Sequence, residues 1–190
     1  MKTQLSVLTA LLVLIGCTGI AFAADDAAQD PAAPAEPRED KLAMMRVHLG
    51  KWTATVKGKA TDLIPEPYEV TDRWETREVL GGRMIEVRGE SNMNGEDTQY
   101  IWLFTYDERE SRYVGWYHES SGINAKMVGE WSDKDKTMTW TLADPEAWGM
   151  QVTIVDNLSD KSKIDYTFKI VLEDGTLVMD QVGSAKRVEE

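Results

Sequence analysis

From residue 51 onward, the chain alternates between apolar and polar positions. Trp52, Ala54 and Val56 alternate with polar neighbours, and a looser alternation recurs further along the chain. The other alternating segments are residues 68–79, 84–89, 99–106, 112–119, 123–131, 137–143, 150–155, 163–172 and 177–187. An apolar residue at every second position turns one face of a strand toward a core. The pattern therefore predicts about ten β-strands.

The breaks between these segments carry residues typical of tight hairpins. Gly81-Gly82, Asn94-Gly95 and Asp174-Gly175 are examples, and such pairs readily adopt the positive φ angles of hairpin turns. No break is long enough for the crossover helix that parallel pairing requires, so we expect antiparallel neighbours. A sheet of this size with one apolar face tends to close and remove its edges. We predict an all-β, up-and-down antiparallel barrel, with a two-sheet sandwich as the alternative.

A short helix is predicted just before the first strand. Asp40 suits an N-cap, Leu42, Met45 and Leu49 follow at helical spacing, and Gly50 suits the C-terminal end. Such a short amphipathic helix is not stable alone, because its packing supplies most of its stability. We expect it to cover one end of the barrel.

The N-terminus has the features of an export signal. Lys2 precedes a short apolar run at residues 5–15, and Ala21-Phe22-Ala23 fits signal-peptidase cleavage. We therefore predict a signal peptide over residues 1–23 and a periplasmic or secreted protein. In the alternative, residues 14–17 form a lipoprotein box, Cys17 is lipidated and the protein is anchored in the cell envelope. This anchor would be its only membrane contact.

Composition divides the rest of the chain into a tether and one domain. Residues 24–39 are rich in Ala, Pro and acidic residues and predict a disordered tether, and residues 40–190 form the predicted barrel domain. Cleavage after Ala23 leaves no cysteine and therefore no internal disulfide. It also leaves 20 basic against 33 acidic residues. This charge repels phosphate backbones, so we expect no nucleic-acid partner.

Two resemblances to known families follow from short motifs. Gly50-Lys51-Trp52 resembles the Gly-x-Trp motif of the calycin superfamily, which includes the lipocalins. This resemblance implies that Trp52 packs near a basic residue late in the chain, here Lys186 or Arg187. The order of five further motifs resembles an exported bacterial family known as domain of unknown function fifteen seventy-nine. Those motifs are residues 49–52, 80–84, 106–107, 113–116 and 144–149. The family implies a lipocalin-like barrel and no activity, and this sequence departs from it at His118-Glu119-Ser120.

Residues suited to catalysis or metal binding are few. The sequence contains two histidines, of which His48 lies in the predicted helix and suits a contact with its last carbonyls. His118 shares a strand face with Val114 and Trp116, and this face points either outward or into the barrel. No zinc-ligand spacing or nucleophile turn accompanies it, so we expect no metal. Barrels resembling nitrobindin hold haem through a late histidine, which is missing here unless His118 replaces it. We therefore expect no cofactor.

The sequence suggests ligand binding without assigning a ligand. The candidate ligand-binding residues are Trp52, Trp74, Trp116, His118 and Arg88. If two of the charged residues Asp72, Arg83, Arg88 and Asp180 point inward, they form a polar anchor. Our leading hypothesis is a non-catalytic barrel that holds a small apolar or amphiphilic molecule. The alternative is a structural or interaction domain with a filled core and an exposed aromatic face at Tyr100, Trp102 and Phe104. A haem-binding or hydrolytic barrel is the third hypothesis.

Overall fold

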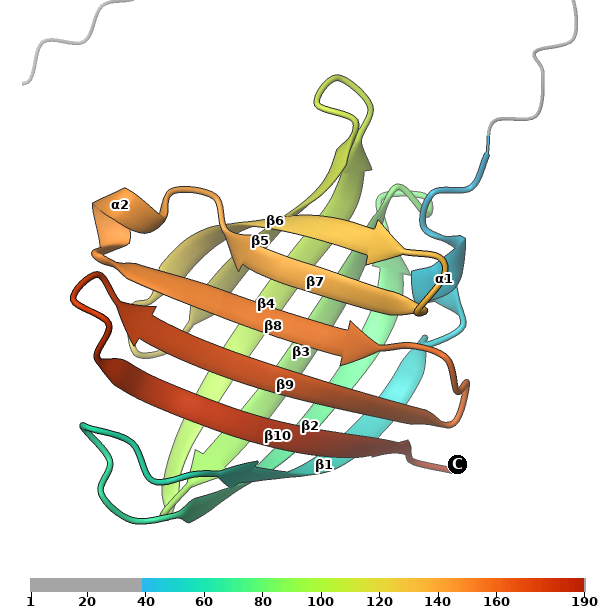
Figure 1. Ribbon diagram of the computed structural model, residues 1–190. Coiled ribbons are helices and arrows are strands. Elements are labelled where there is room, and N and C mark those ends of the chain that lie inside the picture. Colours follow the sequence, from blue (N-terminus) through green and yellow to red (C-terminus); the bar gives the residue numbers. More distant parts are fainter. Residues whose placement is uncertain (1–38, 190) are drawn as a thin grey trace, which may run out of the picture. The chain divides into compact units, whose positions relative to one another are not determined.

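The computed structural model describes residues 39–189, which form ten antiparallel strands closed into a barrel (Figure 1). The strands are β1 (Gly50–Gly58), β2 (Tyr68–Val79), β3 (Met84–Met93), β4 (Glu96–Asp107), β5 (Arg112–Glu119), β6 (Asn124–Ser132), β7 (Thr137–Leu142), β8 (Met150–Asn157), β9 (Lys163–Leu172) and β10 (Leu177–Arg187). Each strand pairs with its neighbours in sequence, and β10 pairs with β1 to close the barrel. The predicted up-and-down barrel is confirmed, and the sandwich alternative is not adopted.

The predicted signal peptide, the tether and the alternative lipid anchor at Cys17 lie outside the residues that the structure describes. They therefore stay predictions. Within residues 39–189, no helix has the length and apolar character needed to cross a bilayer.

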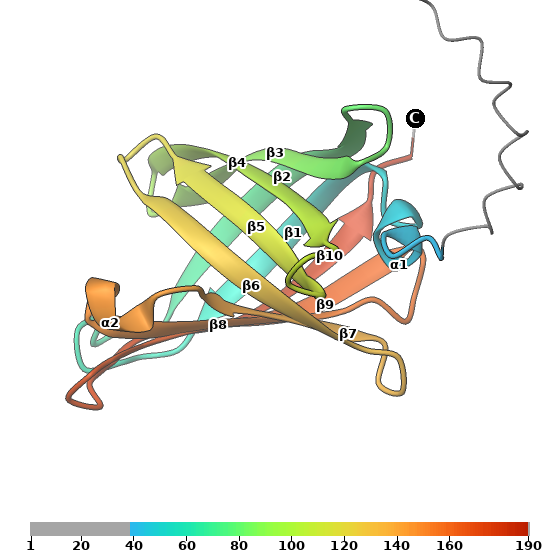
Figure 2. The same cartoon turned by 90° about the horizontal axis from the view of Figure 1, so that it is seen from above.

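Hairpin turns follow the glycine-containing breaks in the sequence. Between β3 and β4, Asn94 has a φ of 56° and Gly95 a φ of 89°. Two successive positive φ angles match the right-handed twist of paired strands. Figures 1 and 2 show two short helices at opposite ends of the barrel, α1 (Ala43–Arg46) and α2 (Pro145–Trp148).

Alternation along each strand decides which side chains face the interior. Trp52 and Trp74 are directly opposite on β1 and β2, and Ile85 and Phe104 are opposite on β3 and β4. All four point inward, and Ile85 is 0% exposed. The same register turns the aromatic face of β4, with Tyr100 and Trp102 beside Phe104, into the barrel. The proposed exposed aromatic face on this strand is therefore wrong, because its opposite face meets the solvent.

Helix α1 closes one end of the barrel, as predicted, although it is only a single turn. Its Met45 and the preceding Leu42 are buried in the same cluster as Ile85 and Phe104. Arg46 bonds to the carbonyl oxygen of Gly82 at 2.7 Å and ties the turn to the β2–β3 connection. The helix therefore owes its position to buried side chains and to one long arginine.

Trp52 and Arg187 form the floor beside α1. Trp52 is 1% exposed and donates its indole N–H to the carbonyl oxygen of His48 at 2.9 Å. The guanidinium of Arg187 lies 4.7 Å from the Trp52 ring centre. It also donates to the carbonyl oxygen of Val47 at 2.7 Å and to that of Lys161 at 3.1 Å. Of the two basic residues that the calycin resemblance allowed, Arg187 is the one that packs against the tryptophan.

Candidate functional site

The barrel interior is packed at the α1 end and more open toward the other end. Near α1, Ile85 and Met138 are both 0% exposed. Farther along, several inward side chains remain partly exposed although they point away from the outer surface: Asp72, Trp74, Tyr100, Trp102, Tyr117, Phe168 and Tyr166. The inward-facing side chains therefore leave space between them toward this end of the barrel. We call this inner space, lined by these residues, the lumen.

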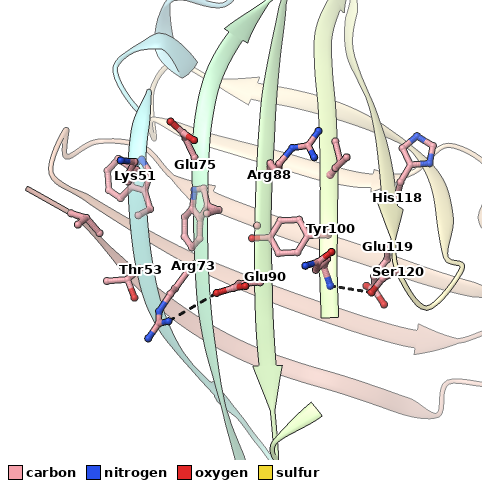
Figure 3. Close-up of a pocket in the computed structure, with 16 residues that line it drawn as sticks. Lys51, Thr53, Arg73, Glu75, Arg88, Glu90, Tyr100, His118, Glu119 and Ser120 are labelled. Atoms are coloured by element: carbon pink, nitrogen blue, oxygen red, sulfur yellow. Dashed lines mark hydrogen bonds and ion pairs between the residues drawn. The ribbon is translucent and has the colours of Figure 1, made fainter. Parts of the chain in front are cut away.

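Glycines in the wall let aromatic rings lie flat against it. A Cβ atom on Gly89 of β3 would stand 2.5 Å from the Tyr100 ring, which is far closer than any real contact. The ring crosses β3, as Figure 3 shows, and its hydroxyl donates to Asp72 on β2 at 3.0 Å. Gly58 accommodates Tyr68 in the same way. Rings that lie along the wall occupy less of the lumen than rings that project into it.

Replacing Gly89 with Ala is expected to displace Tyr100 and break its bond to Asp72. Overpacking of this kind costs about 2 kcal/mol of unfolding free energy, measurable by urea denaturation. The control is the same substitution in a Tyr100→Ala background, where the cost should fall but not vanish, because the new methyl group still stands 2.7 Å from the backbone carbonyl oxygen of Arg73. An equal cost in both backgrounds would show that Gly89 is needed by the backbone and not by the ring.

Two polar atoms in the lumen wall have no hydrogen-bond partner. The hydroxyl oxygen of Tyr166 and the indole nitrogen of Trp102 are buried and unpaired. Tyr166 lies over Gly183, but the residue opposite that glycine on β1 is the apolar Val56. Tyr68 lies over Gly58 in the same way, but there the residue opposite the glycine on β10 is Gln181. The side-chain amide of Gln181 donates to the Tyr68 hydroxyl at 3.1 Å. An unpaired buried polar group costs about 1–3 kcal/mol, so each of these atoms calls for an explanation.

Carboxyl groups face the lumen from three strands, Asp72 on β2, Glu119 on β5 and Asp156 on β8. Asp72 accepts hydrogen bonds from Tyr100 and, at 3.1 Å, from Ser91, and burial raises the pKa of its carboxyl. Asp156 on β8 shares the inward face of the adjacent Met138. Burial raises the pKa of Asp156 to about 7, although a hydrogen bond from Trp140 acts in the opposite direction. These carboxyls make the lumen polar as well as aromatic.

A second hollow, a groove of about 910 Å³, crosses the outer face of β1 to β5 (Figure 3). Two rows of outward side chains border it, and its lining also includes the inward-facing residues Trp74, Tyr100 and Glu119. One row places Lys51, Glu75 and Arg88 on successive strands, so opposite charges are neighbours. In the other row, Arg73 and Glu90 form an ion pair at 4.0 Å. Such pairs stabilise neighbouring strands, so the groove has the character of a solvated outer wall.

The structure separates the five ligand-binding residues that the sequence suggested. Trp74 faces the lumen, and Trp52 belongs to the floor. Arg88 and His118 border the outer groove, and Trp116 lies on the same outward face as His118. The inward orientation considered for His118 is corrected, because its imidazole meets Asn124 at 2.7 Å on the outside. Ligand binding by any of the five stays a prediction.

Of the four charged residues considered as inward anchors, only Asp72 points into the barrel. Asp180 pairs with Lys59 at 2.8 Å, and Arg83 and Arg88 are exposed. The sequence analysis missed Asp156, which occupies an apolar position in the alternation of Val152 and Ile154. The signal in the sequence was an acidic residue at a position where the alternation predicts an inward side chain, and this signal would have identified Asp156. Among residues 39–189, no group of three or more His, Cys, Asp or Glu residues is placed to hold a metal ion.

The closed ten-strand barrel, with its tryptophan floor and its lumen, has a calycin-like or lipocalin-like fold. The chain belongs to the family described as "Protein of unknown function (DUF1579)", whose model matches residues 36–179. The family resemblance predicted from the sequence is thereby confirmed, and the closed barrel is the fold that the calycin resemblance implied.

Solved structures of other proteins share this fold. Rv2717c from M. tuberculosis is 17% identical, with a TM-score of 0.61, over 78% of this chain and 97% of the other. The S-type phycobiliprotein lyase CPES from Guillardia theta is 11% identical, with a TM-score of 0.52, over 76% and 90% of the two chains. A comparison with curated proteins finds no match. At these identities the likeness establishes the fold alone.

Proposed function

We propose that this protein is a non-catalytic binding protein that holds a small apolar or amphiphilic molecule in its lumen. The observation that carries the proposal is the lumen itself, in which partly exposed rings lie flat against the wall. Its polar atoms suit an amphiphile, because Asp72 and the unpaired Tyr166 hydroxyl stand among aromatic rings. Binding pockets for small molecules typically combine an apolar lining with a few such polar groups.

Of the residues suggested by the sequence, Trp74 is the one placed to contact a lumen ligand. We propose that Tyr100 and Tyr117, whose rings stack with centres 5.9 Å apart, line the site with it. If the export signal acts as predicted, the ligand is encountered in the periplasm, outside the cell or at the envelope surface.

The haem hypothesis requires His118 as the iron ligand inside the barrel, but His118 points out of the barrel. The other histidine, His48, is enclosed in the floor with its ring nitrogens facing the carbonyl oxygens of Met44 and Asp160 at 3.2 and 3.1 Å. Neither histidine offers a free nitrogen to the lumen. A hydrolase that uses His118 would likewise act on the outer wall, where Ser120 is exposed, whereas the neighbouring Glu119 faces inward.

Filling the lumen is expected to abolish binding. Ala125 faces inward on β6 opposite Tyr117, and the next residue, Lys126, faces outward. An uncharged polarity-sensitive naphthalene dye should bind the wild-type protein at one site, with a blue-shifted emission. The substitution Ala125→Trp should weaken this binding at least about ten-fold, because the indole takes the ligand's volume.

The matched control is Lys126→Trp, which adds the same ring outside and should leave the dye affinity within about two-fold. Native mass spectrometry of the gently purified protein provides a second measurement, in which a noncovalent added mass identifies the natural ligand. A protein that carries no added mass and binds no dye would contradict the proposal and favour an interaction domain with a filled core.

A further inference from the structure

Basic and acidic side chains are distributed unequally between the inner and outer faces of the barrel wall. Within residues 39–189, Arg187 is the only lysine or arginine on a strand that shares the inward register, and it is committed to the floor. In contrast, Asp72, Glu119 and Asp156 all face inward. The lumen is therefore acidic, and the protein supplies no cation there to balance it.

Each of these carboxyls accepts hydrogen bonds from uncharged groups of the protein. Glu119 accepts a hydrogen bond from Tyr117 at 2.6 Å, and Asp72 accepts bonds from Tyr100 and Ser91. Asp156 has the indole of Trp140 as its hydrogen-bond donor. A buried carboxylate without an opposite charge is costly, so a cation that enters the lumen gains strong interactions there.

Tyr166, whose hydroxyl is unpaired, lies directly opposite Asp156 on the neighbouring strand β9. Burial, and then the charges of Asp72 and Asp156, raise the pKa of this hydroxyl above its ordinary value, so both carboxyls lie within electrostatic range of it. The hydroxyl oxygen is fully buried and has no partner of its own. The hydroxyl oxygen is free to accept a hydrogen bond, so the N–H group of an amine beside Asp156 would complete its contacts.

Aromatic faces complete the environment. Trp74 and Tyr166 meet edge to face with ring centres 6.5 Å apart, and Tyr100 stacks with Tyr117. The negative faces of such rings attract organic cations, and the attraction is strongest where water is displaced. Rings and carboxylates together favour a positively charged nitrogen over an anion or an uncharged group.

We propose that the lumen ligand is an organic cation, an amine or quaternary ammonium attached to an apolar or aromatic body. This proposal rests on the proposed function and specifies the chemistry of the same site. The charged nitrogen lies near Asp72, Tyr166 and Asp156, and the apolar part lies against the rings toward the open end. The acidity of the whole chain, with a net charge of −12, favours the approach of cations.

The test compares two probes of the same shape. Benzyltrimethylammonium and neopentylbenzene differ by one atom, a charged nitrogen in the first and a carbon in the second. Each is used to displace the uncharged naphthalene dye from the full folded protein at pH 8. We expect the cation to bind at least about ten-fold more tightly than the neutral probe.

Variants locate the charge that is recognised. The substitutions Asp156→Asn and Asp72→Asn should each weaken binding of the cation several-fold more than binding of the neutral probe. The matched control is Asp165→Asn, which removes an exposed carboxylate from the outer face of β9. The advantage should also persist in 0.5 M salt, because enclosed charges are screened less than surface charges.

The outcomes separate this inference from the function on which it rests. Equal affinities for the two probes, or an advantage that Asp165→Asn reduces as much as Asp156→Asn, would overturn the cation proposal and leave a lumen that binds uncharged molecules. Failure of the dye itself to bind would instead overturn the proposed function. Tighter binding of the neutral probe would show that the cost of removing the cation from water exceeds its attraction to the acids, and would equally reject the cation proposal.

Discussion

Replacing Asp156 with Asn is expected to raise the free energy of unfolding at pH 8 by about 4 kcal/mol and to change it little at pH 4. Burial raises the pKa of this carboxyl from an ordinary value of 3.8 to about 7 in the folded protein. The folded state therefore holds the proton more tightly than the unfolded state. Between pH 4 and 7 the unfolded state has released this proton while the folded state still holds it, so the free energy of unfolding of the wild-type protein falls as the pH rises. Above pH 7 both states have released the proton, and the loss of stability stays constant.

The groups around Asp156 do not obscure this effect. Met138 and Trp140 of β7 have no proton to exchange in this range, and Tyr166 of β9 titrates far above pH 8 because burial raises its pKa. Asp72 is present in both proteins, so its contribution cancels in the difference between them. The asparagine keeps an oxygen that accepts the Trp140 hydrogen bond.

The measurement is urea denaturation of the wild type and the variant at pH 4, 6 and 8. Asp165→Asn is again the control, because Lys163 bonds to that exposed carboxylate at 2.7 Å and lowers its pKa. Its loss should destabilise the protein slightly, and more at pH 8 than at pH 4, which is the opposite trend. If the free energy of unfolding changed with pH in the same way for the wild type and Asp156→Asn, Asp156 would ionise as freely as a surface acid, and the prediction would be wrong.

A gain in stability from this substitution bears on function. Natural proteins often depart from the usual rules of stability at functional sites. Asp156 could be replaced by a neutral residue at a gain of several kilocalories per mole, so its presence indicates a role that folding alone does not explain. A bound cation would offset the same cost, and the ligand should then stabilise the wild type more than the variant.

The fold was predictable because its determinants are local. Alternation placed the strands, and pairs such as Asn94-Gly95 placed the hairpins. Closure followed from the number of strands, because an open sheet of that size leaves unpaired edges. The contact between Trp52 and a basic residue late in the chain was predicted from a family motif. Nothing in the spacing of Trp52 and Arg187 indicates by itself that residues so far apart meet.

The lumen was less predictable, because alternation defines two faces without saying which one points inward. Residues 99–106 are apolar on both faces, and the inward one became clear only from pairing with the buried Ile85 of β3. On β5 the sequence allows two inward faces, one with Trp116 and His118 and the other with Tyr113 and Tyr117. The second row faces inward, so His118 does not. The contact between Gly89 and Tyr100 depends on strand pairing and has no local signature.

Replacing Trp52 with Ala is expected to cost about 4 kcal/mol of unfolding free energy, the other large effect that the structure predicts. The side chain is 1% exposed, its ring lies under Arg187, and its N–H is the donor to the His48 carbonyl. Truncation leaves a large cavity and removes the surface on which the guanidinium rests. Urea denaturation at pH 7 measures the cost, and Trp148→Ala, which truncates a half-exposed tryptophan of α2, should change stability by less than about 0.5 kcal/mol.

The same variant decides whether Trp52 is also a ligand residue. Because the indole belongs to the floor and is buried beneath Arg187, the folded fraction of Trp52→Ala should bind the naphthalene dye with nearly the wild-type affinity under stabilising conditions. Trp74→Ala should show the reverse pattern, with a large loss of dye affinity and a smaller loss of stability, because Trp74 is partly exposed to the lumen. If dye affinity fell equally in both variants, the binding site would extend down to the floor and Trp52 would belong to it.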